Sequence, residues 1–175
     1  LRLVGSEMCI RDRSSLPHFA ENEEGKLRRQ ALSMAIDREE ITSKIFDGSR
    51  TPAKDFSSPL MPGYTEDIEG NEVLEFDLET AKDLWAQAEA ISPFQGTFEL
   101  SYNADGAGNK EWVEAVVNQW RTNLEIDAEP KAFPTFAELR ELVTNRTIGT
   151  AFRTGWQPDY RSICLLYTSP SPRDV

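Results

Sequence analysis

Apolar side chains recur with a helical period near the start of the chain. Leu27, Ala31 and Met34 lie three to four residues apart, so they would share one face of a helix, while Arg28 points elsewhere. This spacing predicts a helix that packs through its apolar face. No single residue of this helix is expected to bind a ligand, because the whole pattern is typical of scaffold.

A second helix is predicted directly after the first. Asp37 is the expected N-cap, and Glu40 follows three residues later as in a capping box. Ile41 and Ile45 give this helix a stripe of buried positions, and Gly48 predicts its end.

The rest of the chain alternates between helical and strand patterns. Phe98, Leu100 and Tyr102 alternate with polar residues, which predicts a half-buried strand. Phe136 and Leu139 are expected to face inward from a later helix. Helices are predicted at residues 78–90, 109–124 and 136–144, and strands at 97–102, 126–131 and 150–156.

This order predicts an α/β fold in which helices pack on a largely parallel or mixed sheet. The stretch between Lys54 and Phe76 is rich in Pro, Gly and acidic residues, and it is expected to be a long surface connection. In the helix of residues 109–124, Trp112 and Trp120 lie on the apolar face, so they are predicted to belong to the core.

Both ends of the chain resemble translated sequencing adapter rather than natural protein. Residues 3–12 resemble one reading frame of the adapter, and residues 164–174 resemble its reverse complement. We therefore expect residues 1–13 and 164–175 to be non-native and residues 14–163 to be the natural part. A short targeting peptide and a disordered Ser-Pro tail are the alternatives for the two ends.

Composition narrows the possible functions. The formal net charge is −11, which would repel the phosphate backbone, so no nucleic acid is expected as partner. Cys9 and Cys164 both lie in the adapter-like ends, so a disulfide scaffold, a zinc site and a thiol nucleophile lose support. His18 is the only histidine and is predicted to be a solvated loop residue. We expect no metal and no cofactor.

Several ordered segments resemble the dipeptide- and oligopeptide-type solute-binding proteins of ABC importers, family 5. The resemblance starts with the two helices and the Asp37-Arg38 junction between them and continues with Gly48-x-x-x-Pro52-Ala53 and Pro62-Gly63-Tyr64. It ends with Gly155-Trp156-x-x-Asp159-Tyr160. The resemblance implies part of the C-terminal lobe, residues 14–163, of a two-lobed type II periplasmic-binding-protein fold, whose other lobe would complete the ligand cleft.

The family resemblance also implies a ligand site after the last predicted strand. Asp159 would receive the α-ammonium group of a peptide, and Trp156 and Tyr160 would wall the pocket. Arg153 would face the ligand or its waters, and Arg146 is a second candidate of this kind. Without the resemblance, Asp159 would be a turn residue after a proline and Arg153 a surface strand residue.

The implied function is the extracytoplasmic substrate-binding component of a peptide ABC importer, which is not an enzyme. Its partners would be di- and oligopeptides and the permease and ATPase complex, and we expect a monomer, either periplasmic or a lipoprotein at the outer face of the cytoplasmic membrane. Within the same family an oligosaccharide or a nickel complex is the alternative ligand. A secreted hydrolase with a carboxylate pair is the alternative from another class, although no spacing singles out an acid and a base.

Overall fold

Three parallel strands form the centre of the structure, a computed structural model that describes residues 18–54, 64 and 70–153 of the 175-residue chain. They are β1 (Phe98–Asn103), β2 (Ala128–Phe133) and β3 (Ala151–Phe152). The order across the sheet is β2-β1-β3, with Leu100 of β1 opposite Ala151 of β3. The expected arrangement of helices on a sheet is confirmed, and the described strands are all parallel.

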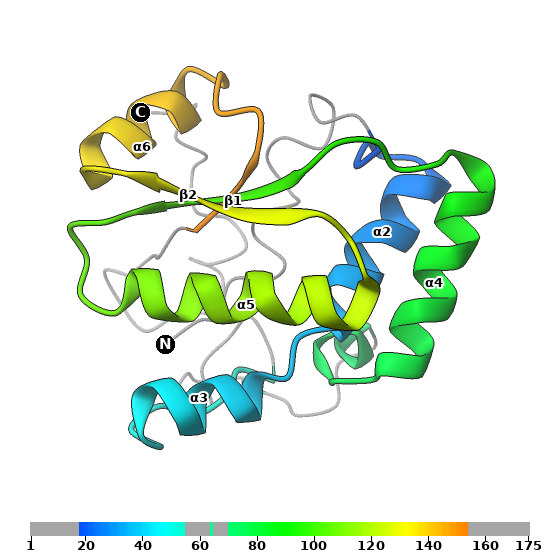
Figure 1. The fold of residues 1–175 in the computed structure, drawn as a ribbon, viewed down its shortest axis with the longest axis horizontal. Helices are drawn as coiled ribbons and strands as arrows, with labels where there is room; N and C mark the ends of the chain where they lie inside the picture. Colours follow the sequence, from blue (N-terminus) through cyan, green and yellow to red (C-terminus); the bar gives the residue numbers. More distant parts are fainter. Residues whose placement is uncertain (1–17, 55–63, 65–69, 154–175) are drawn as a thin grey trace.

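Two helices connect the strands and cover opposite faces of the sheet. Helix α5 (Asn109–Leu124) leads from β1 to β2, and α6 (Phe136–Thr144) leads from β2 back across β1 to β3. Crossover connections between parallel strands are right-handed, so two crossovers that run in opposite directions across a sheet place their helices on opposite faces. Helices α5 and α6 therefore lie on different faces of this sheet. Figure 1 shows α5 along one side of the strands and α6 on the other. Both helices have the predicted bounds.

The larger core lies between β1 and α5. Phe98, Leu100 and Tyr102 of β1 are buried there together with Trp112 and Trp120 of α5. The indole Nε1 of Trp120 also donates a hydrogen bond of 2.9 Å to a backbone carbonyl of the first helix. The prediction that both tryptophans belong to the core is confirmed.

The other face of β1 is buried as well, so the prediction of a half-buried strand was wrong. Ser101 and Asn103 are 0% and 5% exposed, because a second cluster that includes Leu139 of α6 and Phe152 of β3 covers this face. The expectation that Phe136 faces inward was also wrong. Phe136 is the first residue of α6, beyond the ends of the strands, and is 38% exposed.

The N-terminal helices form a layer beside the sheet. Helix α2 (Glu23–Met34) packs against α4 (Leu78–Ile91), as Figure 1 shows, and α3 (Arg38–Phe46) packs against α5. A short 3-10 helix, η1 (Asn71–Leu74), interrupts the predicted surface connection. Much of the rest of that connection lies outside the described residues, as do both adapter-like ends and the two cysteines.

Asp37 caps α3 as predicted, but the capping box does not form. The Asp37 carboxylate accepts a hydrogen bond from the backbone N–H of Glu40 at 2.8 Å. The backbone N–H of Asp37 donates to Gln119 of α5 at 2.9 Å, while the Glu40 carboxylate accepts from Lys44 and from Gln119. The side chain of Gln119 thus accepts the hydrogen bond from the backbone of Asp37 that Glu40 would accept in a capping box.

Two other predictions about polar residues were wrong. Arg28, expected to point away from the packed face, is fully buried because Glu24 and Glu89 accept hydrogen bonds from its guanidinium. His18, expected to be solvated, is half-buried and its Nδ1 lies 2.7 Å from the Glu24 carboxylate. Its ring also makes an edge contact with Phe94.

Candidate functional site

The carboxyl ends of all three strands meet at one edge of the sheet, because the strands are parallel. Asn103 is the last residue of β1, and Arg153 directly follows β3. The backbone N–H of Arg153 donates to the carbonyl of Ser101 at 2.7 Å, so Arg153 is fixed to the sheet at this point. Ligands of open α/β folds bind outside the carboxyl ends of the strands, which makes this carboxyl edge the candidate site.

Asn103 is the central polar residue of the carboxyl edge. Its Oδ1 accepts hydrogen bonds from Nη1 of Arg153 and from Nδ2 of Asn109, both at 3.3 Å. Its Nδ2 donates to Oδ1 of Asp105 at 2.6 Å. Asn109 donates in addition to the Asn103 carbonyl at 3.0 Å. Since Asn103 and Asn109 are both 5% exposed, these bonds fix the amide that holds the Arg153 side chain.

Asp105 supplies a negative charge next to this network. Its other oxygen, Oδ2, accepts from the backbone N–H of Phe136, the first residue of α6, at 3.1 Å. The hydrogen bond from Asn103 lowers the pKa of Asp105 most, and the bond from Phe136 and the charge of Arg153 lower it further. Asp105 is therefore ionised at neutral pH, with one oxygen on Asn103 and the other at the N-terminus of a helix.

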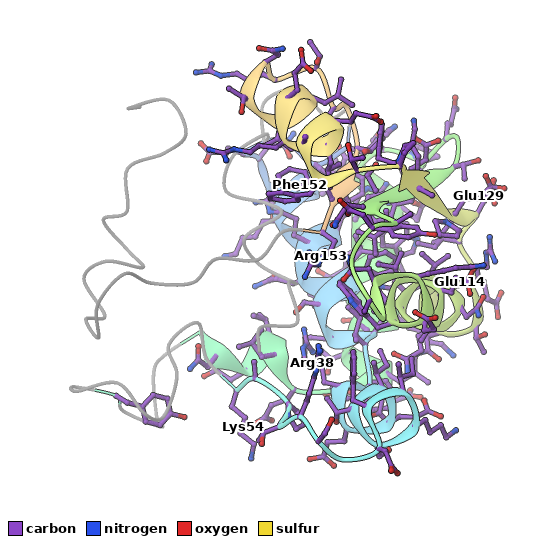
Figure 2. The ribbon with its side chains drawn as sticks, turned by 90° about the vertical axis from the view of Figure 1, so that its left-hand side faces the viewer. Arg38, Lys54, Glu114, Glu129, Phe152 and Arg153 are labelled. Atoms are coloured by element: carbon purple, nitrogen blue, oxygen red, sulfur yellow. The ribbon has the colours of Figure 1, made fainter. Side chains whose placement is uncertain are left out.

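Arg153 is half-buried, and Figure 2 shows it beside Phe152, on the side of the molecule away from Glu114 and Glu129. Burial lowers the pKa of its guanidinium most, the charge of Arg50 lowers it further, and Asp105 raises it. An arginine keeps its charge under such shifts because its ordinary pKa lies far above neutral pH. The carboxyl edge thus presents a charged, partly desolvated guanidinium that is already oriented.

The five predicted site residues have different outcomes. Arg153 lies at the carboxyl edge. Phe136, the first residue of α6, lies at the carboxyl edge, because its backbone N–H donates to Asp105. Arg146 follows the opposite, C-terminal end of α6, so the structure does not bring it to Arg153. Trp156, Asp159 and Tyr160 lie outside the described residues.

Three residues near Arg153 were not predicted from the sequence: Asn103, Asp105 and Arg50. The available signal was an Asn-x-Asp pair directly after a predicted strand, since polar residues at that position fall on the edge where ligands bind. Nothing in the local sequence of Arg50 links it to Arg153, which is more than a hundred residues away.

Other kinds of site find less support in the described part of the chain. Residues 18–54, 64 and 70–153 contain no group of three or more His, Cys, Asp or Glu side chains that could hold a metal ion. In the same ranges, none of the helices has the length and apolar character that a membrane crossing requires. A groove of about 400 Å³ lies between α3 and α5, with Phe76, Gln119 and Lys44 among its lining residues.

Comparisons with known proteins agree on one family. The profile of the family described as "Bacterial extracellular solute-binding proteins, family 5 Middle" matches residues 22–166. The periplasmic oligopeptide-binding protein OppA of Salmonella typhimurium is 31% identical over 140 residues, which cover 75% of this chain and 24% of that protein. The oligopeptide-binding protein OppA of Bacillus subtilis is 31% identical over 106 residues, 58% of this chain and 19% of that protein.

The fold is similar to solved structures of such proteins. A crystal structure of a periplasmic oligopeptide-binding protein (OppAIV) from Borrelia burgdorferi superposes with a TM-score of 0.70 at 23% identity, over 87% of this chain and 29% of that chain. The chain therefore spans about a quarter of the length of the relatives that it matches. The carboxyl edge of the sheet lies within the matched residues.

Proposed function

Because the chain belongs to the bacterial extracellular solute-binding proteins of family 5, we propose that it forms part of the extracytoplasmic receptor of a peptide ABC importer. The receptor would capture di- and oligopeptides between two lobes and deliver them to a permease and ATPase complex. It would act as a monomer, in the periplasm or as a lipoprotein at the outer face of the cytoplasmic membrane. The family consists of solute-binding transport proteins, so we propose capture and release without covalent chemistry.

The observation that carries this proposal is the convergence of polar groups at the carboxyl edge. Arg153 and Asn103 offer donors and acceptors there, and both are held by hydrogen bonds before any ligand arrives. A peptide carries an ammonium, a carboxylate and a row of amides, and it needs such partners when a closing cleft excludes water. The names of the two OppA relatives support a peptide rather than another solute.

Asp159 is our proposed partner of the ligand ammonium. It lies six residues after Arg153 in the chain, so the segment that carries it starts at the carboxyl edge. An ammonium that loses its water needs a charged acceptor, because burial without one costs several kcal/mol. Trp156 and Tyr160 would wall the pocket and accept varied side chains. Arg146 is left out of this site, because it lies beyond the other end of α6.

Replacing Asp159 tests this proposal. In the complete receptor that contains this segment, Asp159→Asn should weaken binding of trialanine about tenfold to a hundredfold, the range for a lost hydrogen bond to a charged group. Isothermal titration calorimetry measures the affinity. Asp83→Asn is the matched control, because Asp83 is exposed on α4 and undergoes the same change of charge. Equal affinities of wild type and Asp159→Asn would remove Asp159 from the site.

An experiment on the same receptor distinguishes a transport protein from a hydrolase. Peptides and glycosides incubated with it and analysed by mass spectrometry should be recovered intact, whereas turnover would favour the hydrolase alternative. Oligosaccharides and nickel complexes tested by calorimetry beside the peptides should bind more weakly than peptides. Binding of one of them in preference to every peptide would contradict the proposed ligand.

A further inference from the structure

His18 joins the segment before α2 to the first turn of that helix. Its Nδ1 lies 2.7 Å from Oε1 of Glu24, a residue of this first turn. Its ring also meets the ring of Phe94 edge-on, with 5.5 Å between the two centroids. The side chains of His18 and Glu24 are 21% and 10% exposed, so water has limited access to the bond between them. The bond therefore ties a segment outside the helix to the helix itself.

The residues directly after the histidine fit closely on α2. A Cβ atom at Gly25 would overlap the carbonyl oxygen of Ala20, so glycine allows this close approach. Arg29 donates from Nη1 to the carbonyls of Phe19 and Ala20, at 2.8 and 2.9 Å. The buried ring of Phe19 packs against Phe98 of β1, with 4.9 Å between the centroids. A weaker bond at the histidine would therefore loosen a segment that belongs to the larger core.

The charges around His18 favour one more positive charge. Within residues 18–54, 64 and 70–153, Glu24 forms ion pairs with His18 and Arg28 and with no other group. Arg28 also pairs with Glu89 of α4, so one guanidinium serves two carboxylates. Burial raises the pKa of Glu24, but the hydrogen bonds from His18 and Arg28 outweigh it, so Glu24 is ionised at neutral pH. An imidazolium would compensate the remaining negative charge, because the two carboxylates outweigh the repulsion from Arg28.

We propose that His18 is a pH-sensitive clasp, which fastens the segment before α2 more firmly when its imidazole is protonated. An imidazolium donates a charge-assisted hydrogen bond to Glu24, and such a bond is about twice as strong as a neutral one. The protonated form therefore gains more from folding than the neutral form. Its contribution is complete in mild acid and is lost as the pH rises through the range where histidine loses its proton, around an ordinary pKa of about 6.5. An extracytoplasmic receptor, as proposed above, would expose the clasp to the pH of its surroundings.

Urea unfolding of the full chain at pH 5.5 and pH 7.5 tests the clasp. His18 is the only histidine in the chain, so no other side chain has its ordinary pKa between these two values. The folding equilibrium constant of wild type should fall about fivefold from pH 5.5 to pH 7.5, the difference between a charged and a neutral hydrogen bond. His18→Gln keeps a neutral donor and should show no such fall. Glu24→Gln is the matched variant, because it keeps the histidine, removes its charged partner and should also show no fall.

Equal stability of wild type at the two pH values, or a fall that persists in either variant, would overturn the inference.

A second experiment measures the clasp locally. The backbone N–H groups of Gly25 and Lys26 bond to the side chain and the carbonyl of Asn22, at the start of α2. Their protection against hydrogen exchange, corrected for the pH dependence of the intrinsic rate, should be about fivefold higher at pH 5.5 than at pH 7.5 in wild type. His18→Gln should show the same protection at both values, and a wild type that does so contradicts the clasp. Neither experiment uses a peptide, so the clasp can stand even if the proposed function fails.

Discussion

Arg28 shows how a charged residue can hold a packed layer together. Its side chain is fully buried, its Nε donates to Glu24 at 3.2 Å and its Nη1 to Glu89 at 2.7 Å. A third donor, Nη2, reaches the carbonyl of Ser92. The guanidinium also lies 4.6 Å from the ring centroid of Trp85. One residue therefore joins α2 to α4 and to the segment that follows α4.

Removing Arg28 should strongly destabilise the fold. Arg28→Met keeps much of the side-chain volume but leaves the carboxylate of Glu24, which is 8% exposed, without its buried cation. Breaking a buried pair in this way costs about 3 kcal/mol of unfolding free energy. Lys44→Met is the control, because the ion pair of Lys44 with Glu40 is exposed to solvent, where such pairs contribute little to stability. Urea denaturation compares the two variants, and similar losses would contradict the role of Arg28.

The sequence could not predict the burial of Arg28 or the place of Arg50. Helical periodicity assigns a charged residue beside an apolar stripe to solvent, and this holds unless distant groups supply partners. The partners of Arg28 on α4 and after it are 61 and 64 residues away in sequence. Arg153 was named from the family resemblance, whereas Asn103 and Asp105 could have been found from their place directly after a predicted strand.

At the scale of elements, features set by local sequence were predicted well. Asp37 caps the helix that it was expected to cap, because an N-cap depends on residues within three positions, and Asp77 caps α4 in the same way. The burial of the second face of β1 was not predicted, since the burial of Ser101 depends on a helix that comes much later in the chain. The capping box of α3 failed because Gln119 of α5 takes its place.

Gln119 should therefore couple the start of α3 to α5. Asp37→Ala and Gln119→Ala should each lower the free energy of unfolding by about 1 kcal/mol. The first variant removes the cap bond itself, and the second removes the hydrogen bond that Gln119 accepts from the backbone N–H of Asp37. Together they should cost less than the sum by at least about 0.5 kcal/mol, because both changes loosen the same first turn. Denaturant unfolding of the two single variants and the double variant gives this coupling energy.

Asp77→Ala serves as the control for this cycle. Asp77 caps α4, and its carboxylate accepts hydrogen bonds from Thr80 rather than from Gln119. Asp77→Ala and Gln119→Ala should thus be additive within about 0.5 kcal/mol. Additivity of Asp37→Ala with Gln119→Ala would show that the bonds of Gln119 do not support the cap of α3.

At the scale of the molecule, the order of the segments was the strongest signal in the sequence. The resemblance over residues 28–160 is confirmed by the family profile over residues 22–166 and by the fold of solved relatives. The expected class, part of a type II periplasmic-binding-protein fold, is therefore confirmed. Which residues contact a ligand was harder to predict, since that depends on how the carboxyl edge brings together side chains from separate loops.

The whole molecule should lose stability in acid, because several carboxyl groups have lowered pKa values in the fold. Burial raises the pKa of Glu24, but hydrogen bonds from His18 and Arg28 outweigh it, so the net shift is downward. The pKa of Asp77 is lowered mainly by its bond from Thr80. The unfolded chain binds protons more readily at such groups, so their contribution is complete above the ordinary carboxyl pKa of about 4 and is lost as the pH falls through the folded values.

Glu24→Gln should show how much Glu24 contributes to this loss of stability in acid. The variant should be less stable than wild type at pH 7, because Arg28 and His18 lose a charged acceptor. Its stability should also fall less steeply below pH 5, because one titrating group with a lowered pKa is gone. Glu129→Gln, an exposed change on β2, should leave the slope as in wild type. Urea unfolding at pH steps from 7 to 3 measures these slopes, and parallel curves for Glu24→Gln and wild type would show that Glu24 has no part in the acid response.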